Sequence, residues 1–330
     1  MQVEADTLDL WNGLLDRARA DVPLYRERLP PSRLTSLDQI AELPFTVRED
    51  FRRTYPFELF AAPLEQVVRV HMSSGTTGRP VVTGYTRADL DRWGECMERV
   101  YRAAGVTAAD VVQNAYGYGL FTGGLGFHLG AERLGCVVVP TSSGVTQRQV
   151  MLLRDLGTTV LACTPSYALV LAEAAAQAGA RGQLRLRAGF FGAEPWTDGM
   201  RAEIEGGLGL EAFDIYGLTE LGGPGVAVEC RRHDGLHVFE DHYFPEVVDP
   251  ETGRPLPPGE PGELVLTALR REASPVIRYR TRDRTALVEE PCPCGSPFRR
   301  MRKIHGRTDD MLVVRGENVF PSQIEDILLG

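Results

Sequence analysis

The sequence predicts an α/β fold in which parallel sheets are flanked by helices, followed by an antiparallel, β-barrel-like subdomain. Between residues 86 and 205, apolar strand-like runs alternate with helical patterns, which is typical of a parallel sheet covered by helices on both faces. After about Cys230, short strand-like runs are separated by turns such as Pro257-Pro258-Gly259, and no helical pattern returns until residues 321–325. A length of 330 residues exceeds the usual size of a single core, so subdomains or two domains are expected.

Composition excludes several classes of function. An apolar content of 43%, a charged content of 25% and a net charge of −9 describe an ordinary globular protein without the basic face that nucleic-acid binding needs. No apolar run is long enough to span a membrane, and the start of the sequence lacks the basic and apolar regions of a secretory signal. We therefore expect a cytoplasmic protein with no nucleic-acid or membrane partner.

Each element follows from its own pattern. Residues 7–20 place Leu8, Trp11, Leu14, Leu15 and Ala18 at helical spacing, which predicts an amphipathic helix that ends near Pro23. Ser36 is expected to cap a second helix. Further helices are predicted at 86–104, 124–134, 146–156, 166–178 and 198–205, and strands at 111–115, 137–139, 159–163, 186–191, 237–239, 243–248, 263–267 and 286–289. We divide the chain into an α/β part (1–229), a β-rich part (230–305) and a final segment (306–330).

A hydroxyl-rich loop follows the β-branched run 67–70. Four hydroxyl residues and two glycines occupy six consecutive positions: Ser73, Ser74, Gly75, Thr76, Thr77 and Gly78. Glycines allow close backbone approach, and successive N–H groups form an anion site. The spacing and the missing Lys exclude a Walker loop. The alternative is an exposed polar hairpin loop.

Three later segments are further candidate motifs. In the run 214–220, Tyr216 can stack on a purine, Thr219 can reach a phosphate and Glu220 can bind Mg²⁺, which prefers oxygen ligands. A strand end followed by a capped helix is the alternative for this run. The other segments are 191–195 and 278–283, which ends in Asp283 and could instead be a surface ion-pair stretch. A fourth motif spans residues 306–312.

Together these motifs resemble the adenylate-forming superfamily of acyl-CoA ligases, adenylation domains and luciferases, and in particular its phenylacetate-CoA ligase branch. The resemblance implies that residues 73–78 bind phosphate and that Asp283 binds the ribose hydroxyls. Arg282 stands where most of the superfamily has Gly, as we expect in this branch. Arg307 would contact the nucleotide, and Asp309 would be the hinge for a small C-terminal domain. Its nucleotide-binding set also includes Ala193, Glu194, Pro195, Asp214, Ile215, Tyr216 and Thr219, and Thr219 and Glu220 form its catalytic pair.

The resemblance assigns residues 113–124 to the wall of an aryl pocket, with Tyr116 and Phe121 facing the ring. Gly192, Ala193, Tyr216 and Gly217 complete the predicted substrate set, and their small members leave room for a flat ring. No Lys or Arg lies in these segments to pair with a second carboxylate, which favours an aryl or arylacetic monoacid. A glycine-bearing turn with core aromatic residues is the alternative.

Cysteines indicate a possible zinc site. Cys230, Cys292, Cys294 and His237 supply sulfur and imidazole ligands suited to tetrahedral Zn²⁺, and members of the resembled branch have the same placement. His233 is a competing ligand, and free surface thiols are the alternative. Cys96, Cys136 and Cys163 lie in apolar or helical patterns and are expected in the core.

These observations predict an enzyme that uses ATP and Mg²⁺ to convert an aryl acid to aryl-AMP and then transfers the acyl group to coenzyme A. A carrier-protein phosphopantetheine is the alternative acceptor, and a homodimer is possible. The resemblance also implies a C-terminal domain with a lysine that contacts the reacting carboxylate and the α-phosphate, and this lysine cannot be assigned in this sequence. A nucleotide or acyl-adenylate binding module with impaired catalysis is therefore the rival class of function.

Overall fold

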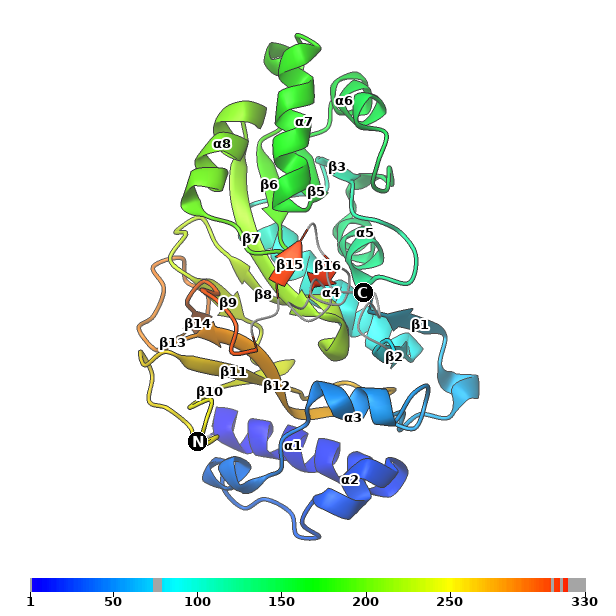
Figure 1. Cartoon of the computed structure of the whole chain (residues 1–330), viewed down its shortest axis with the longest axis vertical. Helices are drawn as coiled ribbons and strands as arrows, with labels where there is room; N and C mark the ends of the chain where they lie inside the picture. Colours follow the sequence, from blue (N-terminus) through cyan, green and yellow to red (C-terminus); the bar gives the residue numbers. More distant parts are fainter. Residues whose placement is uncertain (1, 74–78, 310–311, 315–316, 320–330) are drawn as a thin grey trace, which may run out of the picture. The chain divides into compact units, whose positions relative to one another are not determined.

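The structure is a computed structural model that describes residues 2–73, 79–309, 312–314 and 317–319. The chain forms two compact units. Unit 1 comprises Met1–Arg92, Thr219–Gly222 and Val238–Asp310, and unit 2 comprises Trp93–Leu218, Gly223–His237 and Met311–Gly330. Figure 1 shows the whole chain coloured along the sequence. The predicted three-part division of the chain stays a prediction.

Unit 2 contains the alternating part of the fold. Its parallel strands are β3 (Val111–Asn114), β4 (Val137–Val139), β5 (Val160–Cys163), β6 (Ala188–Phe191) and β7 (Glu211–Leu218), in the spatial order β7-β6-β5-β3-β4. The strand β8 (Gly223–Glu229) pairs antiparallel with β7. The connecting helices are α5 (Thr122–Leu134), α6 (Thr146–Asp155), α7 (Pro165–Gln177) and α8 (Asp198–Leu208), preceded by α4 (Arg87–Ala103). This order confirms the predicted alternation of strands and helices.

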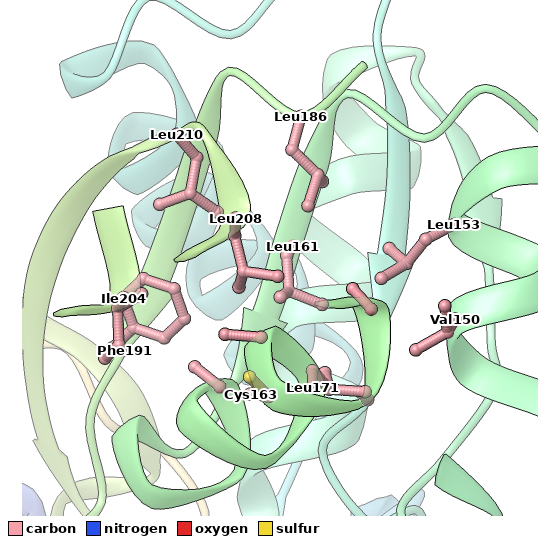
Figure 2. Close-up of a cluster of buried hydrophobic side chains, with 14 of the residues drawn as sticks. Val150, Leu153, Leu161, Cys163, Leu171, Leu186, Phe191, Ile204, Leu208 and Leu210 are labelled. Atoms are coloured by element: carbon pink, nitrogen blue, oxygen red, sulfur yellow. The ribbon is translucent and has the colours of Figure 1, made fainter. Parts of the chain in front are cut away.

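Helices cover both faces of this sheet, as one pair of neighbouring residues illustrates. Phe190 and Phe191 are consecutive on β6 and therefore point to opposite faces. Phe191 belongs to a buried cluster with residues of α6, α7 and α8, including Leu153, Leu171 and Ile204 (Figure 2). Phe190 packs on the other side, where its ring centroid lies 5.1 Å from that of Tyr101 on α4 and 6.3 Å from that of Phe127 on α5. The sheet is thus buried on both faces.

Unit 1 is built on antiparallel strands. The sheet β10-β11-β12 comprises Tyr243–Val248, Gly262–Ala268 and Val276–Thr285. A hairpin is formed by β1 (Arg69–Met72) and β2 (Val82–Tyr85), and a second short pair by β13 (Leu287–Val288) and β14 (Arg300–Met301). The antiparallel character predicted for the later part of the chain is confirmed.

The N-terminal helices also belong to unit 1. Helix α1 (Gln2–Asp21) buries Trp11, Leu14, Leu15 and Ala18, as the spacing predicts, and the Trp11 ring packs edge-on against Phe244 at 5.5 Å. The remaining helices are α2 (Pro23–Arg28), α3 (Arg48–Arg53) and the short 3₁₀ segments η1 (Leu37–Glu42), η2 (Leu64–Gln66) and η4 (Thr219–Leu221). Ser36 does cap η1, through a capping box with Gln39.

The remaining short elements are η3 (Arg181–Gln183), β9 (Leu236–Val238), β15 (Leu312–Val314) and β16 (Glu317–Val319). Cys96 and Cys163 are buried as expected, whereas Cys136 is only partly buried. Its thiol lies at the start of the strand region, where it donates to the carbonyl of Thr107 at 3.3 Å. No helix among the described residues has the length and apolar character needed to cross a bilayer.

Candidate active site

The β1–β2 hairpin carries the predicted phosphate loop. Strands β1 and β2 pair from Arg69 with Tyr85 to Met72 with Val82. Beyond them, the Ser73 N–H donates to the Val81 carbonyl at 3.0 Å, and the Val81 N–H donates to the Ser73 Oγ at 3.0 Å. These reciprocal bonds close the base of the loop. Ser74, Gly75, Thr76, Thr77 and Gly78 lie outside the described residues.

Unit 1 also contains the predicted catalytic carboxylate. Thr219 and Glu220 are buried in η4, directly after β7. The Tyr279 hydroxyl, from β12, donates to Glu220 Oε1 at 3.1 Å. Burial first, and the neighbouring Glu220 charge next, raise the pKa of Tyr279 well above its ordinary value. The hydroxyl is therefore a permanent donor to this carboxylate at neutral pH.

Three predicted nucleotide and hinge residues meet in unit 1. The Arg307 guanidinium forms an ion pair with Asp283 Oδ1 at 2.5 Å and two bonds with Asp309, at 2.9 and 3.1 Å. The backbones of Asp283 and Arg307 form an antiparallel bridge. Arg307 thus pairs with both carboxylates, and Asp283 is buried beside it.

The backbone conformation of Arg282 explains why most of the resembled superfamily has glycine at this position. Its φ is +68°, a left-handed conformation that glycine adopts without steric cost and other residues rarely adopt. The Arg282 N–H donates to Glu263 Oε1 at 3.2 Å, and its guanidinium lies 3.5 Å from Oε2 of the same carboxylate. Glu263 is fully buried, so these contacts hold Arg282 in the conformation that glycine would adopt freely.

In unit 2, the carboxyl edge of the parallel sheet brings two predicted segments together. Phe191 pairs with Asp214 in register, so residues 192–195 and 215–217 continue side by side from β6 and β7. Ala193 has a φ of +70°, and the Glu194 carboxylate accepts the Ser166 N–H at the start of α7 at 2.6 Å. Glu194 thus supports a helix N-terminus, where an anion is favoured.

The predicted aryl-pocket residues Tyr116 and Phe121 differ in their exposure to solvent. Tyr116 is buried, its ring stacks on Phe127 with centroids 4.9 Å apart, and its hydroxyl donates to the Gly192 carbonyl at 3.3 Å. Phe121 precedes α5 and is 38% exposed. The Tyr116 bond joins two of the predicted substrate segments, and Phe121 remains accessible beside them.

Close packing of the backbone requires glycine at two positions of this site. A Cβ on Gly192 would lie 2.4 Å from the Ile215 carbonyl oxygen, and a Cβ on Gly217 would lie 2.2 Å from the Gly223 carbonyl oxygen. Both contacts are with backbone and are far too short. Gly192 and Gly217 are therefore needed for close approach of neighbouring chain segments, whether or not they also leave room for a ring.

Sequence reasoning missed two polar networks in unit 2. In the first, the Asn114 amide donates to the Tyr118 hydroxyl at 2.8 Å and to the Gly124 carbonyl, and that hydroxyl lies 3.1 Å from His128 Nδ1. His128 Nε2 then lies 2.9 Å from Glu132. This chain of contacts fixes the turn between β3 and α5. The i, i+4 spacing of His128 and Glu132 on one helix was the available signal.

The second network supports β7. Glu229 accepts two bonds from Arg201, at 2.8 and 2.9 Å, and the Asp214 N–H at 2.9 Å. His233 lies between Glu229 and Glu211, with its two ring nitrogens 3.3 and 3.1 Å from the respective carboxylates. With both nitrogens engaged, His233 is a poor candidate for the competing metal ligand.

The predicted zinc ligands are divided between the units. Cys230 and His237 are buried in unit 2, at the end of β8 and in β9, whereas Cys292 is buried and Cys294 exposed in unit 1, between β13 and β14. Val238, the residue after His237, donates its N–H to the Arg299 carbonyl at 3.0 Å, and both of these residues belong to unit 1.

Comparison with known proteins identifies the family. The AMP-binding enzyme family matches residues 26–268, and the chain therefore belongs to this family of adenylate-forming enzymes. It is 52% identical over 322 residues to the phenylacetate-coenzyme A ligase of Pseudomonas putida, a match that covers 96% of this chain and 73% of that protein. It is 51% identical over 320 residues to the phenylacetate-coenzyme A ligase of Escherichia coli strain K12, covering 94% and 72%. The resemblance inferred from the motifs is confirmed.

A solved structure supports the same conclusion. The crystal structure of a 2-hydroxyisobutyryl-CoA ligase in complex with 2-HIB-AMP and CoA matches with a TM-score of 0.94 at 30% identity. The match covers 99% of this chain and 73% of that one. The predicted α/β fold class is therefore confirmed.

Proposed function

We propose that the protein activates an arylacetic acid with ATP to form aryl-AMP and pyrophosphate, and then transfers the acyl group to coenzyme A. The observation that carries this proposal is the 52% identity to a phenylacetate-coenzyme A ligase over 96% of the chain. The placement of Glu220, Asp283 and Arg307 in one compact unit is consistent with it. ATP, Mg²⁺ and coenzyme A are the cofactors and co-substrates that such a reaction requires.

In the proposed reaction the carboxylate attacks the α-phosphorus of ATP in line, and pyrophosphate leaves. Residues 73–78 would bind the phosphates, and Mg²⁺ held by Glu220 would neutralise the leaving group. Thr219 would bind a phosphate oxygen. This is catalysis by positioning and electrostatic stabilisation. A thiol then attacks the mixed anhydride, forming the thioester and releasing AMP.

The remaining nucleotide contacts are assigned by position. Asp283 would accept the ribose hydroxyls, with Arg307 beside it. Along the sheet edge of unit 2, the segments 193–195 and 214–216 would line the adenine. Asp309 is proposed as the hinge residue.

The substrate side of the site is proposed in unit 2. Tyr116, Phe121, Gly192, Ala193, Tyr216 and Gly217 would surround the aryl ring. The buried Tyr116 ring and the accessible Phe121 ring offer flat apolar surfaces, and no Lys or Arg in residues 113–124 would bind a second acidic group. These features support a monoacid with an aromatic ring.

Product analysis tests the proposed activity. The protein is incubated with phenylacetate, ATP, Mg²⁺ and either coenzyme A or a phosphopantetheinylated carrier protein, and acyl-AMP and thioester are detected by mass spectrometry. We expect phenylacetyl-AMP and phenylacetyl-CoA. A product formed only on the carrier protein would support the alternative acceptor. Nucleotide binding without any acyl-AMP would support the rival, a binding module without full catalysis.

Two substitutions test the nucleotide assignment. Glu220→Gln should weaken Mg²⁺-dependent ATP use, and Asp283→Ala should weaken adenosine binding. Glu260→Gln, an exposed carboxylate of unit 1, serves as the matched control and should leave both unchanged. Unchanged affinity for ATP in both site variants would contradict the assignment.

We also propose a structural Zn²⁺ held by Cys230, His237, Cys292 and Cys294. Three thiolates and an imidazole are the donor set of tetrahedral structural zinc, and the engagement of His233 by Glu229 and Glu211 leaves His237 as the preferred imidazole. Metal analysis of protein purified without added metal should give about one zinc per chain.

Cys292→Ser should release this zinc and lower the melting temperature, whereas Cys136→Ser should do neither. Absence of metal together with free titration of the three thiols would refute the site. A cytoplasmic location and a homodimer also stay predictions, the latter to be tested by light scattering.

A further inference from the structure

Tyr279 contacts the proposed magnesium ligand directly. Its hydroxyl donates to Glu220 Oε1 at 3.1 Å, and the two residues are separated by 59 positions in the sequence. Both side chains are buried in unit 1.

The position of the Tyr279 ring is fixed by its surroundings. The ring packs edge-on against Phe51 of α3, with centroids 5.5 Å apart, and the backbones of Tyr279 and Thr46 form a parallel bridge. The buried Tyr279 hydroxyl is therefore held facing one oxygen of the Glu220 carboxylate.

Because Tyr279 holds one oxygen of the Glu220 carboxylate, the direction of the other oxygen is fixed as well. A carboxylate has two oxygens and about four acceptor positions, and a single donor occupies one of them. Mg²⁺ demands near-ideal octahedral geometry and therefore discriminates between rotamers of its ligands. Hydrogen bonds from outside the ligand shell commonly orient metal-binding carboxylates in this way.

We propose that Tyr279 is a positioning residue that orients the Glu220 carboxylate for Mg²⁺. This inference rests on the proposed role of Glu220 as the magnesium ligand. Tyr279 lies on the strand β12, which also carries Asp283, so one strand would position both the metal ligand and the proposed ribose ligand. Tyr279 would act through Glu220 and would not touch the reacting atoms.

Tyr279→Phe removes the hydroxyl and keeps the ring. ATP binding to the 330-residue protein is measured by calorimetry across a series of Mg²⁺ concentrations. Loss of a hydrogen bond to a charged group changes an equilibrium by about tenfold or more. We therefore expect the Mg²⁺ concentration for half-maximal ATP binding to rise about tenfold, whereas ATP binding without Mg²⁺ stays at the wild-type level.

Tyr101→Phe is the matched control for a structural effect. Its hydroxyl donates to the Phe127 carbonyl at 3.0 Å and its side chain is fully buried, but it belongs to unit 2 and has no role in the proposed site. Both variants should lose thermal stability, and only Tyr279→Phe should change the Mg²⁺ dependence. Equal Mg²⁺ dependence in the wild type and Tyr279→Phe, with a lowered melting temperature, would make Tyr279 a structural residue and overturn the inference.

The variant Glu220→Gln separates this inference from the function on which it rests. If Glu220→Gln retains the wild-type Mg²⁺ dependence, the proposed role of Glu220 is wrong and the inference is refuted with it. If Glu220→Gln shifts the dependence and Tyr279→Phe does not, only the inference is wrong. Should Tyr279 act through Glu220, Tyr279→Phe will have no further effect in the Glu220→Gln background.

Discussion

Replacing Glu229 by Gln should destabilise unit 2 strongly. The Glu229 side chain is 4% exposed and that of its partner Arg201 is 14% exposed. The carboxylate accepts two bonds from Arg201 and one from the Asp214 N–H. An amide cannot accept all of them, so the substitution leaves the Arg201 charge without a full partner in a buried position.

The expected magnitude follows from this geometry. Removing one partner of a buried ion pair costs about 3–5 kcal/mol, because the remaining charge stays buried. Arg201 keeps some solvent exposure and a bond to the Ala212 carbonyl, which places the expected loss near the lower end, at about 3 kcal/mol. Since Asp214 and Tyr216 lie on β7, the same change should also loosen the strand that carries the proposed adenine contacts.

Urea denaturation monitored by fluorescence measures this loss. Glu203→Gln makes the same charge change at an exposed position of α8 and should shift the free energy of unfolding by less than about 0.5 kcal/mol. The double variant Arg201→Met/Glu229→Leu removes both charges and should recover part of the loss. A loss below about 1 kcal/mol in Glu229→Gln would refute the view that this ion pair supports β7.

The pH dependence gives an independent check. Burial opposes ionisation of Glu229, but the bonds from His233, Arg201 and the Asp214 N–H outweigh it and lower the pKa of Glu229 below 4.5. The stability that Glu229 contributes is therefore present above pH 4.5 and is lost as the pH falls through the lowered pKa. The difference between wild type and Glu229→Gln should disappear in strong acid.

Three further predictions concern unit 2. Hydrogen bonding to Glu229 raises the pKa of His233 above 6.5. The contribution of His233 to the free energy of unfolding is therefore full below pH 6.5 and is lost as the pH rises through the raised pKa. Urea denaturation should show the wild type losing its stability advantage over His233→Gln across that range. Leu161→Ala, in the buried cluster of Figure 2, should cost about 2–5 kcal/mol in the same assay, and a loss below 1 kcal/mol would be inconsistent with its complete burial. Gly192→Ala should lower the melting temperature and abolish binding of an aryl-AMP analogue, because the new Cβ would lie 2.4 Å from the Ile215 carbonyl oxygen. The control is Gly206→Ala, whose Cβ would have no atom within 4 Å and which should be neutral or stabilising.

Local patterns predicted most of the fold. The spacing of Trp11, Leu14 and Ala18 predicted α1, and the continuous apolar runs predicted the parallel strands, because burial on both faces leaves no polar alternation. The strand β8 was missed. Its Gly223 and Gly225 have φ values of +107° and +93°, and a strand that contains such glycines has the composition of a loop.

The candidate site was predictable only where its residues form contiguous motifs. The segment that ends in Asp283 and the segment that contains Arg307 could each be identified, although their ion pair joins residues 24 positions apart. The contact of Tyr279 with Glu220 and the support of Asp214 by Glu229 depend on how distant segments pack. No spacing rule predicts them, since each partner is an ordinary residue in its own segment.

The central claim is that this chain holds an arylacetyl adenylate. Calorimetric titration of the 330-residue protein with a non-hydrolysable sulfamoyl analogue of phenylacetyl-AMP tests this most directly, with the corresponding hexanoyl analogue as the comparison. We predict that the phenylacetyl analogue binds more tightly than ATP or phenylacetate alone and more tightly than the hexanoyl analogue, and that Asp283→Ala weakens its binding. No binding, or equal binding of the aromatic and aliphatic analogues, would contradict the proposed substrate class and the site described for it.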